Sequence, residues 1–206
     1  VLTAMVNGAG KVTNEDFNSA AIGYEEVDGI YTYDPAKAKE LLAEAGYGDG
    51  FTFTCYLAGD ARNRAATVIQ ANLQEIGVTM KIEMMESATF YERTGKGEHQ
   101  AALSGWIANA EPDNTYRPLF TSYSMGDGGN RSFYSNPQVD ALVDDAAVNS
   151  DPAAVSADHK QILELLVNDA IWVPLNEWTG MVARQADLQG MGLSAIGMER
   201  FEGLHY

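Results

Sequence analysis

The first half of the chain switches between two hydrophobic periods. Residues 51–58, FTFTCYLA, alternate in the way that predicts a strand, and residues 78–84 alternate again. Between them, residues 60–77 have the spacing of a helix that Asp60 would cap and Gly77 would end. The expected apolar face of this helix is Ala65, Ile69, Leu73 and Ile76. A strand, a helix and a strand in so short a span predict a βαβ unit with a parallel sheet.

A second helix is predicted before this unit, in YDPAKAKELLAEAGY. Asp34 can cap it, Pro35 suits its first turn and Gly46 can close it. Its apolar positions predict a buried stripe of Ala38, Leu41, Leu42 and Ala45.

The second half predicts more helix than strand. A short helix is expected over 88–94, followed by a strand, AALSGW, that ends at Trp106. Acidic helices are expected over 137–148 and 152–168, and AIWVPL at 170–175 is expected to form a further strand. The inward-facing side chains of the second acidic helix would be Val155, Ile162, Leu165 and Leu166. The fold class is therefore α/β, with a hairpin-like or irregular tail to the C-terminus.

The charge excludes some partners. The net charge is −16, which repels phosphate backbones and disfavours binding to nucleic acid. No apolar run approaches the length of a membrane span, so we expect no direct membrane span. Seven acids between Pro137 and Asp169 predict a solvated helix face. The chain begins at Val1 with no leader pattern before it, and we expect that it was cut from something longer.

No catalytic or metal-binding motif emerges. Cys55, the only cysteine, lies on the apolar face of a predicted strand and is expected to be a small buried hydrophobe. The spacings of His99, His159 and His205 match no zinc motif, and we expect all three at the surface or in loops. No cofactor, metal site or enzymatic activity is therefore predicted, although acids are too numerous for a hydrolytic carboxylate pair to be ruled out by spacing.

The segment GWIANAEPDN at 105–114 gathers polar side chains behind a large aromatic. One interpretation is structural: Trp106 ends a strand in the core, and Asp113 caps a turn. The other is a pocket wall, with Trp106 as an apolar platform and Asn109 and Glu111 as hydrogen-bonding groups. Gly105 would let the backbone approach a ligand closely.

Several segments in order resemble one protein family. They are YDPAKAKELLAEAGY, the unit from FTFTCYLA to VTMKIE, GWIANAEPDN, FYSNPQVDALVDDAA and LLVNDAIWVPLNEW. From about Tyr33 to Trp178 they resemble the C-terminal lobe of family 5 solute-binding proteins of ABC transporters, the dipeptide, oligopeptide and nickel-binding class.

The resemblance implies a periplasmic-binding-protein-like lobe of type II, with βαβ units around a mixed sheet. Residues 1–32 would continue from a missing N-terminal lobe, 33–178 would form the ligand-binding lobe, and 179–206 would be a tail that packs back toward the missing lobe. The protein would be an extracytoplasmic monomer, in the periplasm or lipid-anchored at the cell surface. It would capture a peptide or small-molecule ligand by closure of two lobes and deliver it to ABC permease transmembrane subunits.

The resemblance also implies a ligand site at Gly105, Trp106 and Asn109, with Glu111, Asp113, Asn130 and Tyr134 as further candidates. Peptide-binding members carry an aspartate at the position of Asn109, where it pairs with the ligand's amine. An amide lacks that counter-charge, which favours a sugar, an opine-like compound or a modified peptide as the ligand. Nickel bound through a carrier stays open, although no ligand cluster argues for it. Two other functions stay open: a ligand-sensing domain of a regulatory protein built on the same lobe, and a hydrolase.

Overall fold

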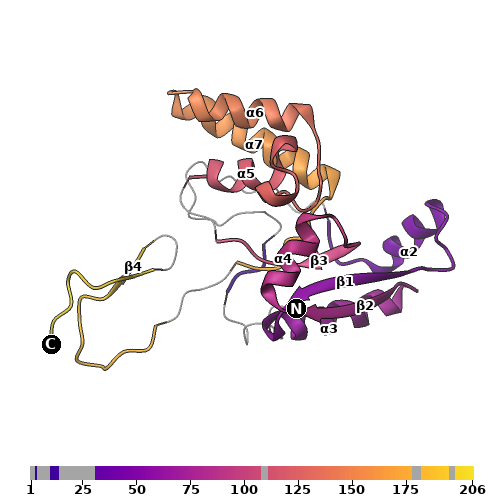
Figure 1. Ribbon diagram of the computed structural model, residues 1–206, viewed down its shortest axis with the longest axis horizontal. Coiled ribbons are helices and arrows are strands. Elements are labelled where there is room, and N and C mark those ends of the chain that lie inside the picture. Colours follow the sequence, from indigo (N-terminus) through magenta and orange to yellow (C-terminus); the bar gives the residue numbers. More distant parts are fainter. Residues whose placement is uncertain (1–2, 4–9, 14–30, 108–110, 178–181, 195–197) are drawn as a thin grey trace.

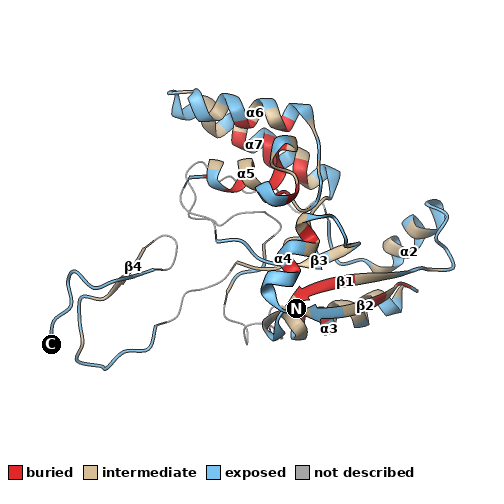
Figure 2. Cartoon of the chain, in the orientation of Figure 1, coloured by how far each residue is buried: buried red, intermediate tan, exposed pale blue. Residues whose placement is uncertain are grey.

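The computed structural model describes residues 3, 10–13, 31–107, 111–177, 182–194 and 198–206. It has three parts: a parallel sheet with its helices, a group of three helices, and a C-terminal arm that extends away from both (Figure 1). Buried residues gather in the first two parts, whereas no described residue of the arm is buried (Figure 2).

The sheet has three parallel strands in the order β2-β1-β3. Their bounds are β1 Thr52–Ala58, β2 Thr79–Met85 and β3 Ala101–Leu103. Helix α3 (Asn63–Glu75) connects β1 to β2, and helix α4 (Ser87–Gly95) connects β2 to β3. The predicted βαβ unit is confirmed, and so is the short helix after it.

The central strand is covered on both faces, because alternate side chains of β1 meet different helices. Cys55 and Leu57 pack with Ala66 of α3 and Met80 of β2 in one hydrophobic core. Tyr56 points the other way, where the guanidinium of Arg93 from α4 lies 4.4 Å from its ring centroid. Helices thus cover both faces of β1, and the carboxyl ends of the strands form the open edge of the sheet.

The start of α3 differs from the prediction. Asp60 does not cap the helix: it begins a 3-10 turn, η1 (Asp60–Arg62), and Arg62 occupies the cap position without a side-chain hydrogen bond. The extra turn moves the cap position from Asp60 to Arg62, and α3 begins at Asn63. Gly77 ends the helical segment as predicted, with a φ of 86°.

Helix α2 (Pro35–Glu44) has the predicted bounds but not the predicted burial. The Asp34 carboxylate accepts a hydrogen bond from the Lys37 amide at 2.9 Å, as expected of a cap. The prediction of a buried apolar stripe is wrong, because no residue of the helix is buried and Leu41 is 51% exposed. Ala38 and Leu42 are only half-buried, and Leu41 and Ala45 are exposed.

The second hydrophobic core lies between three helices. These are α5 Asp113–Phe120, α6 Pro137–Val148 and α7 Pro152–Asp169. The predicted bounds of the two acidic helices are confirmed, with Asn136 and Asp151 as their caps. The buried side chains of this core are Tyr116, Leu119, Phe120, Val139, Val143, Ile162 and Leu166. Where the sequence predicted only a turn capped by Asp113, the chain forms helix α5, and Asp113 is its first residue.

The segment after α7 does not form the predicted strand. AIWVPL is irregular, and it is held by side chains instead: Trp172 stacks edge-on against Phe120 at 4.9 Å. Among the described residues after α7 and before the arm, the only β-bridge is the antiparallel one between Glu177 and Lys11. A side-chain anchor on α5 thus replaces backbone pairing in a sheet.

The loop from 121 to 136 connects α5 to α6 and contacts helix α4. It contains the 3-10 turns η2 (Ser122–Ser124) and η3 (Gly126–Gly128). A methyl group placed on Gly126 would lie 2.7 Å from the Gly95 carbonyl oxygen, so glycine permits this contact with the end of α4.

The arm over 182–206 contains a small hairpin, as expected of the tail. Its antiparallel strands are β4 (Gly192–Leu193) and β5 (Glu199–Arg200). Large apolar side chains stand exposed along it; the most exposed are Met198, Phe201 and Tyr206.

Candidate functional site

The strand order creates a switch point between β1 and β3. The chain leaves β1 toward β2, then returns across β1 to its other side through α4. The loops after β1 and β3 therefore start side by side at the carboxyl edge of the sheet. In open α/β sheets the crevice at this point is where ligands bind, so the loops after Ala58 and Leu103 form the candidate site.

The two loops meet through Arg62 and Gly105. Turn η1 brings the Arg62 side chain from the end of β1 to the exit of β3, so close that a methyl group on Gly105 would lie 2.8 Å from Nη2 of Arg62. The space that the prediction reserved for a ligand beside Gly105 therefore holds the Arg62 guanidinium.

Arg62 is a site residue that sequence reasoning missed. The ion pairs of the described chain involve Lys37, Arg93, Lys96 and Arg117, and the Arg62 guanidinium forms none of them and no hydrogen bond. A partly buried side chain with five N–H donors thus faces the carboxyl edge without an acceptor from the described residues. The sequence feature that could have indicated Arg62 is its position shortly after the predicted strand at 51–58.

Trp106 lies at the surface, beyond the end of β3. Its side chain is 45% exposed, and Ile107 beside it is 81% exposed. The alternative interpretation of Trp106 as a core residue does not describe this arrangement, because neither hydrophobic core includes it. Trp106 and Ile107 form an open apolar surface directly after Gly105, beside which the Arg62 guanidinium lies. Asn109, which follows them, lies outside the described residues.

The acids of this loop are in different situations. Glu111 is exposed. Asp113 is the first residue of α5, not its cap, and its carboxylate accepts a hydrogen bond from Nε of Arg117 at 3.0 Å. Hydrogen bonds to Asp113 and then to Asp144 raise the pKa of Arg117 above its ordinary value. Asp113 is therefore neutralised within its own helix, whereas Glu111 is available to a ligand.

Asn130 stabilises the loop between α5 and α6 through buried hydrogen bonds. It is fully buried, and its amide nitrogen donates to the carbonyl oxygens of Thr121 and Tyr134, each at 2.9 Å. Its oxygen accepts from the Ser132 hydroxyl and the Tyr134 amide. Every hydrogen-bonding position of the side chain is used inside the protein, and a ligand contact by Asn130 stays a prediction.

Tyr134 lies against the helical core. Its hydroxyl donates to Asp169 at 2.6 Å at the end of α7. Burial, followed by the hydrogen bond to Asp169, raises the pKa of Tyr134 to about 12. The structure does not bring this group to the switch point beside Gly105, and its role as a pocket wall also stays a prediction.

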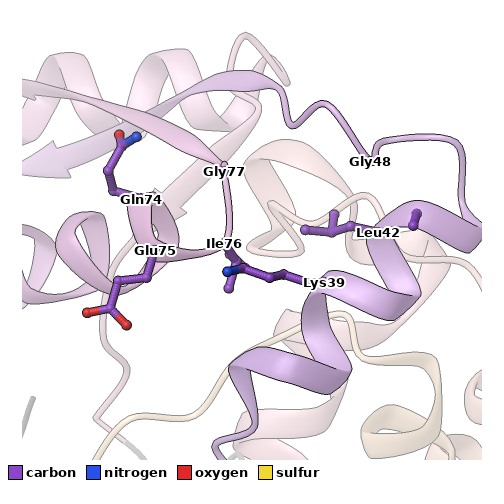
Figure 3. Close-up of a pocket in the computed structure, with 8 residues that line it drawn as sticks. Lys39, Leu42, Gly48, Gln74, Glu75, Ile76 and Gly77 are labelled. Carbon is purple, nitrogen blue, oxygen red and sulfur yellow. The ribbon is translucent and has the colours of Figure 1, made fainter.

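A hollow of about 420 Å³ lies elsewhere, between α2 and the C-terminal end of α3 (Figure 3). Lys39, Leu42, Glu75 and Ile76 line it, together with Gly77, which precedes β2. Because it adjoins the amino ends of the strands, it lies opposite the switch point and is a separate feature.

The histidines and acids offer no metal centre in the described part of the chain. No group of three or more His, Cys, Asp or Glu side chains there could hold an ion. The prediction that all histidines lie at the surface or in loops is wrong for His159, which is 5% exposed in α7 against the Tyr116 ring. None of the described helices is long and apolar enough to cross a membrane.

Comparison with known proteins identifies relatives along the whole chain. The profile described as bacterial extracellular solute-binding proteins, family 5 Middle, matches residues 1–127. Heme-binding protein A of Haemophilus influenzae is 30% identical over 99% of this chain, which spans 38% of that protein. The named relatives are binding proteins.

Solved structures share the fold. HbpA2 from Haemophilus parasuis superposes on 99% of this chain with a TM-score of 0.86 and 30% identity, using 41% of its own length. DppA from Helicobacter pylori, in complex with the peptide STSA, covers 85% of this chain with a TM-score of 0.80 and 34% identity, using 35% of its own length. The expected fold, a lobe of a type II periplasmic binding protein, is confirmed.

Proposed function

Since the chain belongs to the bacterial extracellular solute-binding proteins of family 5, we propose that it forms one ligand-binding lobe of an ABC importer's substrate-binding protein. It captures a peptide-like or other small solute and delivers it to permease transmembrane subunits. The observation that carries this proposal is the switch point, where Arg62, Gly105 and Trp106 present a cation and an apolar platform on one open edge.

The open geometry of this edge favours a binding role over catalysis. Trp106 and Ile107 leave large apolar surfaces in water, which a captured ligand would cover. Among the described residues, the exposed Ser104 at this edge has no hydrogen bond to a base, and the thiol of Cys55 is buried under α3. Capture without chemical change is the activity that these groups support.

The second lobe completes the site in this proposal. The chain spans 38% of the Haemophilus influenzae relative, so residues 1–32 would continue from the other lobe and 33–178 would form this one. The tail at 179–206 would pack against that lobe. The exposed apolar side chains of the arm support this role, because an isolated two-stranded hairpin is only marginally stable in water.

The polar residues of the loop after Trp106 limit the charge of the ligand. Similar proteins bind a peptide or are named for heme, so this family accommodates different solutes. The amide of Asn109 cannot balance the charge of a free amine, and Asp113 is paired with Arg117. Glu111 is the acid that remains for an ammonium group. The protein acts outside the cytoplasm, free in a periplasm or lipid-anchored, as a monomer.

The test is a thermal-shift screen of the full-length protein, combined with Trp106→Ala. Dipeptides, oligopeptides, heme, oligosaccharides and nickel–chelator mixtures are the probes, since a ligand of the folded state raises Tm by mass action. We expect Trp106→Ala to weaken the binding of the selected ligand about tenfold or more while leaving the ligand-free Tm unchanged.

Tyr33→Ala is the matched control, because Tyr33 is an aromatic that is 73% exposed at the start of α2. It should keep wild-type affinity. Equal affinity of wild type and Trp106→Ala would show that Trp106 does not contact the ligand. Turnover of a probe would contradict the binding role and indicate an enzyme.

A further inference from the structure

We propose that an aromatic ring of the captured solute lies over Gly59 and against Met84, where β1 and β2 end. This inference rests on the proposed function and assigns a chemical class to one part of the ligand. A solute that carries an aromatic ring at this place is bound, and its counterpart with a small side chain there is bound more weakly.

Open space lies beside Gly59, the first residue after β1. A methyl group placed on Gly59 would have no described residue within 4 Å, its two chain neighbours aside. Its φ of 64° and ψ of −173° belong to a region that only glycine adopts readily. The Gly59 amide donates to the Met85 carbonyl oxygen at 3.1 Å, which ties this turn to the end of β2. Backbone without a side chain is therefore open to a ligand at the carboxyl edge.

Met84 lies beside this space, one residue before Met85. The register of the sheet aligns Met84 with Leu57, and Leu57 with Leu103, so these side chains form the last row that the three strands share on the α3 face. Leu57 has no exposed surface, whereas the side chain of Met84 is 48% exposed. Met84 belongs to neither hydrophobic core. Much of its thioether side chain therefore stands in solvent next to Gly59.

The neighbouring charged side chains leave this space unfilled. The Arg62 guanidinium lies beside Gly105 at the exit of β3, across β1 from Met84. Glu86 follows β2, and its carboxylate accepts a hydrogen bond from the Ala88 amide and caps α4. Neither group comes within 4 Å of the position that a methyl group on Gly59 would take.

An aromatic ring suits these two neighbours. The bare backbone of a glycine lets a planar group approach closely. Methionine is flexible, and its sulfur makes favourable contacts with the edges of aromatic rings. A bound ring would also cover the exposed apolar surface of Met84 at the edge where open α/β sheets bind their ligands.

The experiment compares matched tripeptides on the full-length protein. The probes are trialanine and the tripeptides in which phenylalanine, leucine or lysine replaces one alanine at each position in turn. Binding is measured by calorimetry for wild type, Met84→Ala and Met84→Leu. The control is Leu41→Ala, because Leu41 of α2 is 51% exposed and thus resembles Met84 in size and exposure.

We expect wild type to bind one phenylalanine tripeptide about tenfold or more tighter than trialanine, because the ring is removed from water. Met84→Ala should lower this ratio of affinities about threefold to tenfold, with the affinity for trialanine unchanged. Met84→Leu should keep part of the ratio, since it retains the apolar volume without the sulfur. Leu41→Ala should keep the full ratio. Gly59→Ala should lower it by filling the open space, and the ratio is the readout because the added Cβ also strains the backbone.

The negative results are distinguishable. A ratio near one, or a ratio that Met84→Ala leaves unchanged, would overturn the aromatic subsite and leave the binding function in place. Tightest binding of a lysine tripeptide would assign the space to an ammonium group beside Asp60 and contradict the inference. If the wider screen selects a solute without an aromatic ring, the inference is wrong although the protein binds. No binding of any tripeptide, and no shift in that screen, would overturn the proposed function and this inference with it.

Discussion

The Tyr116 hydroxyl donates a hydrogen bond to the His159 carbonyl oxygen at 3.3 Å, and the two rings lie 5.6 Å apart. This contact joins the middle of α7 to α5, directly behind the loop that carries Glu111. It also encloses an imidazole whose buried Nδ1 has no hydrogen-bond partner. A protonated His159 would therefore be poorly accommodated.

Acidification should destabilise the protein through His159. Burial lowers its pKa below the ordinary 6.5, an effect that Asp158, Asp113 and Glu111 only partly oppose. A lowered pKa in the folded state means that the unfolded state binds more protons, so the stabilising contribution is complete above about pH 6.5 and is lost as the pH falls. Urea unfolding between about pH 5.5 and 8 measures this slope.

The variant His159→Gln should flatten the pH dependence, whatever it does to stability at pH 8. Burial also lowers the pKa of His99, so part of the slope should persist. Exposed His205 is the control, and His205→Gln should retain the wild-type slope. An unchanged slope in His159→Gln would assign the effect to other groups.

Asn130→Ala should be strongly destabilising. The substitution leaves the carbonyl oxygens of Thr121 and Tyr134 without their buried donor, and each unsatisfied buried group costs about 1–3 kcal/mol. We expect a loss of about 2–4 kcal/mol in the free energy of unfolding, measured by urea titration. Exposed Asn114→Ala should change it by less than about 0.5 kcal/mol. A small change in the free energy of unfolding of Asn130→Ala would mean that the loop between α5 and α6 rearranges to satisfy these carbonyl oxygens.

Ala170→Gly should stabilise the protein. Ala170 ends α7 with a φ of 50°, a left-handed conformation that is unfavourable for residues with a Cβ. Glycine there should add about 0.5–1 kcal/mol. Ala157→Gly, at an exposed position inside the same helix, should instead remove about 1 kcal/mol. Chemical unfolding of both variants measures the change in the free energy of unfolding, which should have opposite signs. Changes of the same sign would contradict a left-handed conformation at Ala170.

The thiol of Cys55 should react only after unfolding. It is 6% exposed in β1, and burial raises its pKa, so little thiolate forms at neutral pH. We expect at least about a hundredfold slower labelling by a disulfide reagent in buffer than in urea. Ser150→Cys, at an exposed position, should label at the rate of a free thiol in both conditions. Fast labelling of Cys55 in buffer would show that β1 opens readily.

Local signals predicted the elements well. Asp34 with Pro35, and Asp151 with Pro152, fix helix starts through a side-chain cap and a preset φ, so α2 and α7 begin where the sequence indicates. The alternation before and after α3 likewise predicted β1 and β2. These signals depend on a few neighbouring residues.

Contacts between distant residues were not predictable in this way. Arg62 and Gly105 meet only because β1 and β3 are neighbours, and no local pattern encodes that pairing. His159 fits the polar spacing of an exposed helix face, but α5 packs over it. Leu41 shows the reverse: its helical spacing predicts burial, yet it is 51% exposed.

Neither hydrophobic core includes a described residue of the loops that follow β1 and β3. In the proposed binding lobe, substitutions in those loops would therefore alter which solute is captured while the free energy of unfolding stays nearly constant. Such a scaffold can diversify rapidly: duplicated copies can acquire new nutrients by changing a few surface residues, without first accumulating compensatory stabilising mutations.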